Sequence, residues 1–162
     1  MKPDFSKAMT FNLDEYVGLD KLNHQSYYYF MHDNLFNHVN IEESKVNFLN
    51  GMAKDLEQEC KRYESLLNQN PIDIQLLGIG SNGHIAFNEP NTESDSLTHQ
   101  VQLTQQTIKD NSRFFAAGEF QPMTALTMGI SSIMQAKMIV LVAKGAGKSE
   151  AVRAALKGPQ SS

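Results

Sequence analysis

The sequence contains a single cysteine, no tryptophan and no long hydrophobic run. The lone thiol, Cys60, excludes an internal disulfide and a zinc site built from cysteines. We expect Cys60 to be a small core residue of a helix, in a protein of the reducing cytoplasm. No apolar stretch approaches the roughly 20 residues that a transmembrane helix requires. Residues 1–5 also lack the pattern of a signal peptide, so we expect no membrane partner.

Positive charge is scarce as well. The 162 residues carry a net charge of −4, and no Lys or Arg occurs between Tyr63 and Ile108. Proteins that bind nucleic acid present a clustered basic face, so we expect no nucleic-acid partner. The length and the content of 41% hydrophobic and 20% charged residues are those of an ordinary globular domain. We therefore treat residues 1–162 as a single domain.

The most informative stretch is an apolar run that ends in glycines. A short and nearly continuous run of this kind is typical of a strand buried on both faces of a parallel sheet. Gly78, Gly80 and Gly83 then allow a tight turn and a close approach to the backbone. The apolar positions of the run are Ile72, Ile74, Leu76, Leu77 and Ile79.

Three polar side chains follow this turn: Asn82, His84 and Glu89. Open α/β sheets bind their ligands beyond the carboxyl ends of the strands, so this is where we expect a site. A glycine-rich turn is common, however, and a single histidine in a protein is more often structural than catalytic.

Strand-like and helix-like stretches alternate along the chain. This order predicts right-handed crossovers and an α/β fold with a doubly wound, mostly parallel sheet. The apolar stretch 123–133 fits either state. We expect strands at 9–13, 46–49, 72–79, 99–103 and 138–142, and helices at 26–37, 52–67, 105–115 and 149–156.

Three charged features have simple interpretations from position alone. Asp14 and Glu15 follow the first predicted strand and would be solvated turn acids. Arg113 would be a solvated helix residue. Lys148 ends the glycine-rich turn 144–148, directly before a predicted helix. Exposed amides at such a helix start, with an added lysine, favour an anion.

Residues 83–90, with the sequence Gly-His-Ile-Ala-Phe-Asn-Glu-Pro, resemble the signature of glucosamine-6-phosphate deaminases. Residues 11–19 with 25–28 form a second match, and residues 111–115 form a third, in the order that the family has. The resemblance implies the Rossmann-like fold that the family shares with ribose-5-phosphate isomerases and CoA transferases. It also implies conversion of glucosamine 6-phosphate and water to fructose 6-phosphate and ammonia, in amino-sugar and N-acetylglucosamine catabolism.

The resemblance assigns four catalytic residues. Such a reaction needs ring opening, proton transfer from C2 to C1, and hydrolysis of a ketimine. His84 would be the ring-opening acid/base, which suits the near-neutral pKa of histidine. Glu89 would be its carboxylate partner, holding the imidazole in one tautomer, and the Asn82 amide would orient His84. Asp14 would move the proton from C2 to C1, which replaces the interpretation as a turn acid.

The same resemblance assigns the substrate phosphate to Arg113 and Lys148, although the loop before Lys148 aligns only with a shift of one residue. It implies no metal and no organic cofactor. Because the last step hydrolyses a carbon–nitrogen bond, we class the expected activity among the hydrolases of carbohydrate metabolism.

The family's fold is larger than this chain at both ends. Members carry a βαβ-sized piece with a Gly-Gly phosphate loop before the Asp14 strand, and a further strand after the last predicted helix. We expect a truncated domain that lacks both, with an incomplete sheet that permits self-association. Two alternatives remain: a 6-phosphogluconolactonase-like hydrolase, and a catalytically silent sugar-phosphate-binding fragment. Residues 14–16 and 87–90 favour the deaminase.

Overall fold

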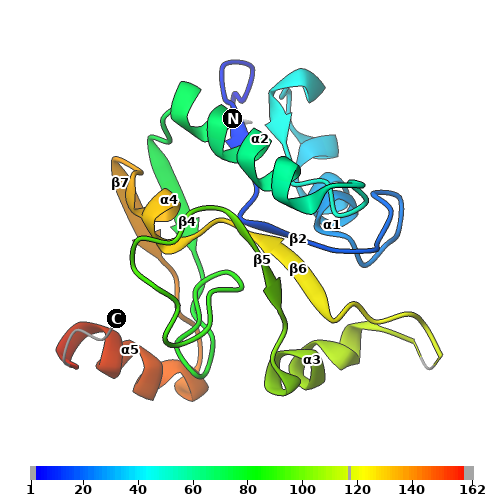
Figure 1. The fold of residues 1–162 in the computed structure, drawn as a ribbon. Helices are drawn as coiled ribbons and strands as arrows, with labels where there is room; N and C mark the ends of the chain where they lie inside the picture. Colours follow the sequence, from blue (N-terminus) through cyan, green and yellow to red (C-terminus); the bar gives the residue numbers. More distant parts are fainter. Residues whose placement is uncertain (1–2, 117, 159–162) are drawn as a thin grey trace.

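The computed structural model describes residues 3–116 and 118–158 of the chain (Figure 1). Strands and helices alternate through most of its length. The strands are β1 (Thr10–Phe11), β2 (Asp14–Tyr16), β3 (Val46–Asn47), β4 (Ile74–Leu77), β5 (His99–Gln102), β6 (Thr124–Thr127) and β7 (Met138–Leu141). The α-helices are α1 (Tyr27–Asn34), α2 (Leu56–Gln69), α3 (Gln105–Asn111), α4 (Ile130–Met134) and α5 (Ser149–Lys157). Short 3₁₀ turns are η1 (Phe36–His38), η2 (Glu43–Lys45), η3 (Ser112–Phe114) and η4 (Ala146–Lys148).

The predicted α/β class is confirmed, with parallel pairing between β1 and β3 and between β4 and β7. The structure adds a three-stranded antiparallel sheet, in the order β2-β6-β5, which the sequence did not predict. Its central strand, β6, comes from the apolar stretch whose state was ambiguous, and α4 follows it. The strand expected at 9–13 is shorter and covers only residues 10–11, as β1. Asp14 does not lie in the turn after it but is the first residue of a second strand, β2.

Helix α2 contributes three buried residues to one core cluster. Cys60, Tyr63 and Leu67 lie on one helical face and are buried against Leu126 and neighbouring side chains of β4 and β6. Burial at this spacing is what an amphipathic helix produces, and the prediction that Cys60 is a core residue is confirmed. The helix begins at residue 56 instead of 52, because the Asp55 side chain caps it by accepting a hydrogen bond from the Gln58 amide, 2.9 Å away.

Strand β4 is not buried on both faces, which corrects the interpretation of its apolar run. Gln75 and Leu77 point into the protein, whereas Ile74 and Leu76 are each 62% exposed. Ile74 lies beside Met138 of β7, and Leu76 beside Val140. Adjacent strands of a sheet share their faces at such paired positions. We call the patch of Ile74, Leu76, Met138 and Val140 the open sheet face.

Figure 1 shows α2 at one end of the molecule, with α3, the start of α5 and the loop that follows β4 at the opposite end. The carboxyl end of β4 points toward the second group. Among the described residues, no helix is both long and apolar enough to cross a membrane.

Candidate active site

The loop after β4 holds His84 against the backbone of Gly80. The Gly80 amide donates a hydrogen bond to the His84 carbonyl, 2.8 Å away. A side chain at position 80 would overlap the His84 ring, so only glycine leaves room for the imidazole. Gly83 between them has a φ of +94°, a conformation that glycine adopts at little cost. The glycines of the motif therefore serve to seat the histidine.

The second half of the loop is fastened to β6. The Asn88 side-chain amide donates to the Met128 carbonyl, 2.8 Å away, in a buried position. The Phe87 amide donates to Thr127 Oγ1 at 3.2 Å. Asn88 is buried, and satisfied hydrogen bonds of this kind fix a backbone firmly. The position of Glu89, one residue later, is set by these contacts.

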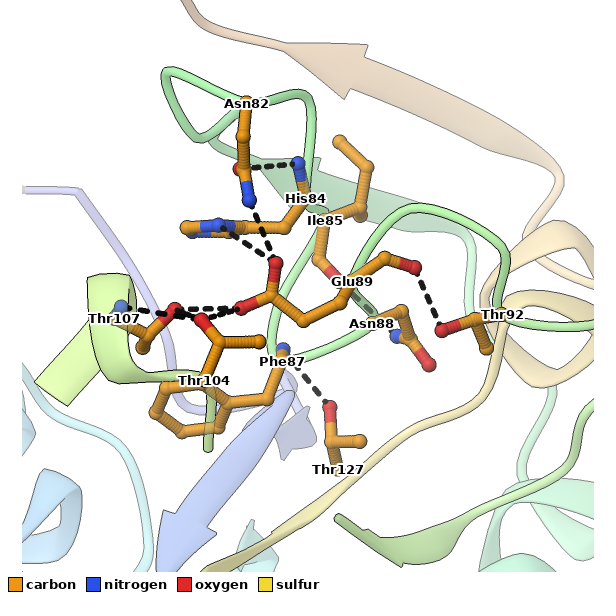
Figure 2. A network of polar contacts seen from close by, with 10 residues as sticks. All are labelled: Asn82, His84, Ile85, Phe87, Asn88, Glu89, Thr92, Thr104, Thr107 and Thr127. Atoms are coloured by element: carbon orange, nitrogen blue, oxygen red, sulfur yellow. Dashed lines mark hydrogen bonds and ion pairs between the residues drawn. The ribbon is translucent and has the colours of Figure 1, made fainter. Parts of the chain in front are cut away.

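Asn82 bridges His84 and Glu89 (Figure 2). Its Oδ1 atom accepts a hydrogen bond from the His84 backbone amide at 3.2 Å, and its Nδ2 atom donates to Glu89 Oε2 at 2.7 Å. The His84 Nδ1 atom lies 3.9 Å from the same carboxylate oxygen, which is too far for a hydrogen bond. Asn82 thus orients the histidine through its backbone, and Glu89 faces the ring as a nearby charge.

The other oxygen of Glu89 contacts two threonines at the start of α3. Thr107 Oγ1 lies 2.5 Å from Glu89 Oε1, and Thr104 Oγ1 lies 3.0 Å from it. Neither threonine was singled out from the sequence. Thr104 is the N-cap of α3 and accepts a hydrogen bond from the Thr107 amide. The Thr-x-x-Thr pattern before a predicted helix was the available signal for a cap, but not for a contact with Glu89.

These contacts decide the charge of Glu89. Burial raises the pKa of a carboxyl, but hydrogen bonds to the charged form lower it. At Glu89 the bonds from Thr107 and Asn82, in that order, are assisted by Thr104 and by the charge of His84. Together they outweigh burial, and the pKa of Glu89 lies below its usual value. The carboxylate is therefore ionised at neutral pH.

Asp14 is buried in β2, which corrects its interpretation from position alone as a solvated turn acid. It stands opposite Thr127 of β6, the residue whose hydroxyl accepts the Phe87 amide. Strand β6 therefore joins the strand of Asp14 to the loop of His84 and Glu89. Burial, with a smaller contribution from the charge of Glu15, raises the pKa of Asp14 to about 7.

Glu15, beside it, has a structural function. Its two carboxylate oxygens accept hydrogen bonds from the backbone amides of Tyr27 and Tyr28 at the start of α1, at 3.0 and 2.9 Å. A third bond comes from its neighbour, Tyr16, at 2.9 Å. Glu15 thus anchors the first turn of α1 to β2 from a buried position.

The two predicted phosphate-binding residues lie outside this network. Arg113 is exposed on η3, and its guanidinium lies 4.7 Å from the Phe114 ring. Lys148 ends η4 and lines an open pocket of about 460 Å³ together with Gly145 and Arg153. Within residues 3–116 and 118–158, neither makes a hydrogen bond or ion pair with the residues around Glu89. The elements that carry them do lie at the same end of the molecule (Figure 1).

Comparison with known proteins places this geometry in a family. The profile described as glucosamine-6-phosphate isomerases/6-phosphogluconolactonase matches residues 2–162. The chain belongs to this family. Its architecture agrees: a solved monomeric glucosamine-6-phosphate deaminase superposes with a TM-score of 0.93 at 46% identity, covering 98% of this chain and 66% of the other.

Two bacterial relatives share the deaminase name. The chain is 56% identical over 158 residues to the glucosamine-6-phosphate deaminase of Clostridium botulinum (strain Loch Maree / Type A3), with coverage of 97% of this chain and 65% of the relative. The enzyme of the same name from Thermoanaerobacter sp. (strain X514) is 53% identical, with coverage of 96% and 62%. The chain thus spans about two thirds of the length of these relatives.

A 6-phosphogluconolactonase from Thermotoga maritima superposes with a TM-score of 0.75 at 16% identity, covering 98% of this chain and 67% of the other. That likeness shows a common fold. The names of the relatives correct one expectation: classing the activity among the hydrolases is wrong. The similar relatives are named deaminases and the family description names isomerases, while the lactonase is the more distant neighbour.

Proposed function

We propose that the chain is a single partial deaminase domain that carries the acid–base residues for converting glucosamine 6-phosphate to fructose 6-phosphate and ammonia. The observation that carries the proposal is the pairing of a seated His84 and an ionised Glu89 with a buried Asp14, in a chain 56% identical to a deaminase. The sugar-phosphate substrate is inferred from the names of the relatives.

Asp14 suits the transfer of a proton from C2 to C1. A group that both takes and returns a proton works best when its pKa lies near the working pH. The pKa of Asp14, about 7, meets that condition. No cluster of three or more His, Cys, Asp or Glu side chains that could hold a metal ion occurs among the described residues.

His84 suits ring opening. His84 would take the proton of the anomeric hydroxyl and give it to the ring oxygen as the bond between that oxygen and C1 breaks, and the ionised Glu89 at 3.9 Å would stabilise the imidazolium that forms in between. Asn82 would hold His84 and Glu89 in a fixed position relative to each other through its hydrogen bonds to both. Arg113 and Lys148 would hold the phosphate of the substrate, which their positive charges and their place at the same end of the fold support.

The test is release of ammonia from glucosamine 6-phosphate by the folded chain, with fructose 6-phosphate measured in parallel. His84→Ala should abolish both products. His38→Ala removes an exposed histidine of η1 that lies outside the site, and it should retain both. A folded wild-type chain that releases no ammonia would contradict the proposal.

The two alternative functions predict different results with the same protein preparation. Hydrolysis of 6-phosphogluconolactone without ammonia release would support the lactonase alternative, which the shared fold keeps open. Thermal stabilisation by glucosamine 6-phosphate without turnover would support a silent binding fragment.

We also propose that the chain self-associates through the open sheet face. Parallel sheets are normally covered on both sides, and here four apolar side chains, each between 38% and 62% exposed, lie on two adjacent strands. Leu76→Glu should lower the mass seen by sedimentation at high protein concentration. Leu97→Glu, a change at a half-exposed leucine elsewhere, is the matched control. Equal masses for both variants and the wild type would contradict the proposal.

We propose a cytoplasmic location for the protein. The single cysteine is buried and unpaired, and burial raises the pKa of its thiol to about 11, which keeps it in the unreactive protonated form. A lone reduced thiol fits a reducing compartment. Fractionation of the source cells, followed by detection of the chain with a specific antibody, tests the location.

A further inference from the structure

Two threonine hydroxyls hold one end of the Glu89 carboxylate. Thr107 Oγ1 is 2.5 Å and Thr104 Oγ1 is 3.0 Å from Glu89 Oε1, and the two hydroxyls are 3.0 Å apart (Figure 2). Thr107 is 4% exposed, so water does not compete freely for its hydroxyl. We call this pair the threonine clamp.

The clamp favours the carboxylate form of Glu89, because a charged oxygen accepts hydrogen bonds from hydroxyl groups more strongly than the oxygen of a neutral carboxyl does. Each hydroxyl has one proton to donate. Thr104 Oγ1 already accepts the Thr107 backbone amide at 3.2 Å, so its own proton is free to go to Glu89 or to the Thr107 hydroxyl. In either arrangement Thr107 donates to Glu89. Protonation of Glu89 would remove the negative charge and so weaken the hydrogen bond that Thr107 donates.

The opposite oxygen is held as well. Asn82 Nδ2 donates to Glu89 Oε2 at 2.7 Å, so the carboxylate is fixed at both ends. In this position, Glu89 Oε2 lies 3.9 Å from His84 Nδ1. Among the described residues, that ring nitrogen is buried and has no hydrogen-bond partner. The clamp thus sets the separation between the carboxylate and the imidazole.

We propose that Thr104 and Thr107 are positioning residues that hold the Glu89 carboxylate in a fixed orientation beside His84. The inference rests on the proposed deaminase function of the same site. The threonines do not touch the reacting atoms, and they act through Glu89. Helix α3 is fixed to the loop of the histidine by this contact, which makes the start of α3 part of the site.

Few other charges face Glu89. In the part of the chain that the structure describes, His84 is the titratable side chain whose charge acts on it, and its remaining partners, Asn82, Thr104 and Thr107, are neutral. A change at the clamp should therefore appear directly in the titration of Glu89.

The first experiment is an NMR pH titration of the Glu89 carboxyl and the His84 ring in full-length variants. Thr107→Val has nearly the same shape as threonine and no hydroxyl, and Thr107→Ser keeps the hydroxyl. Loss of one hydrogen bond to a charged group should raise the pKa of Glu89 by about one unit in the valine variant. The serine variant should titrate as the wild type does. A Glu89 titration unchanged in Thr107→Val would overturn the proposal.

A second variant provides the same test if Thr107→Val does not fold. Thr104→Asp retains an N-cap for α3 but cannot donate to Glu89 when ionised, and it places a second negative charge next to it. The pKa of Glu89 should rise here also, and no rise would overturn the proposal.

Enzyme assays separate this inference from the proposed function. If the chain is active, the acidic limb of kcat/KM should move up by about one pH unit in Thr107→Val and stay in place in Thr107→Ser. An active Thr107→Val enzyme with the wild-type profile would count against the clamp. If the folded wild-type chain releases no ammonia, the proposed function fails, and the titration alone still decides whether the clamp holds Glu89.

Discussion

Replacing Asp14 with Asn should change how the stability of the protein depends on pH. The folded protein holds this carboxyl with a pKa of about 7, against 3.8 for the free group, because the side chain is buried and lies near Glu15. In the unfolded chain the same group ionises near its ordinary value. Between about pH 4 and pH 7 the folded state therefore binds a proton that the unfolded state has lost.

The sign and size follow from this difference. Below about pH 4 both states are protonated, and ionisation costs the fold nothing. As the pH rises from 4 toward 7, ionisation of Asp14 stabilises the unfolded state relative to the folded state. The free energy of unfolding therefore falls, and it levels off above pH 7. At about 1.4 kcal/mol for each unit, a pKa raised from 3.8 to about 7 corresponds to about 4 kcal/mol. Asn cannot ionise, so the variant should escape this loss.

The assay is urea denaturation of wild type and Asp14→Asn at pH values from 4 to 8. The variant should gain about 4 kcal/mol relative to the wild type across this range, whatever constant offset the new amide introduces. Asp95→Asn, at an exposed carboxyl, supplies the comparison for loss of one surface charge. A difference between Asp14→Asn and wild type that does not change with pH would refute the claim that Asp14 is protonated in the folded protein at pH 5 to 6.

Three further changes test the packing that supports the site. Gly80→Ala should displace the His84 ring, seen as a shifted imidazole resonance and a large loss of ammonia release, because a methyl group overlaps the ring position; an unperturbed resonance would contradict the seat. Leu126→Ala, at a fully buried residue, should lower the free energy of unfolding in urea by about 2–5 kcal/mol. Ser26→Ala should cost about 1 kcal/mol by the same measurement, because the hydroxyl caps α1 by accepting the Tyr29 amide at 3.0 Å.

Local sequence patterns were sufficient for several elements. The glycines around His84 predicted a tight turn after a strand, and the structure shows that Gly80 leaves room for the ring of the histidine while Gly83 takes the positive φ of the turn. The helix expected at 52–67 is present as α2, and Cys60, which was expected in the core, lies on its buried face. The helix expected from residue 26 begins there, with Ser26 as its N-cap. In each case the deciding interaction lies within a few residues of the pattern.

Interactions between residues far apart in the sequence could not be predicted from local patterns. Ile74 and Leu76 have the composition of a strand covered on both sides, yet they are exposed, because burial depends on what other elements reach that face. Period-2 alternation was hidden by apolar residues on both sides of the strand. Gln75, the one polar residue of β4, is buried, so hydropathy alone assigned the faces of β4 wrongly.

For the site, the sequence by itself determined which side chains are present and which of them share a loop. His84 follows Asn82 by two residues and Glu89 follows it by seven, so that one turn can bring the three side chains together. Only the tertiary structure decided their chemical states. Strand β6 buries Asp14 beside that turn, and α3 brings Thr104 and Thr107 to Glu89 from 15 and 18 residues away. Charge and pKa depend on neighbours and on burial, and both are properties of the folded chain.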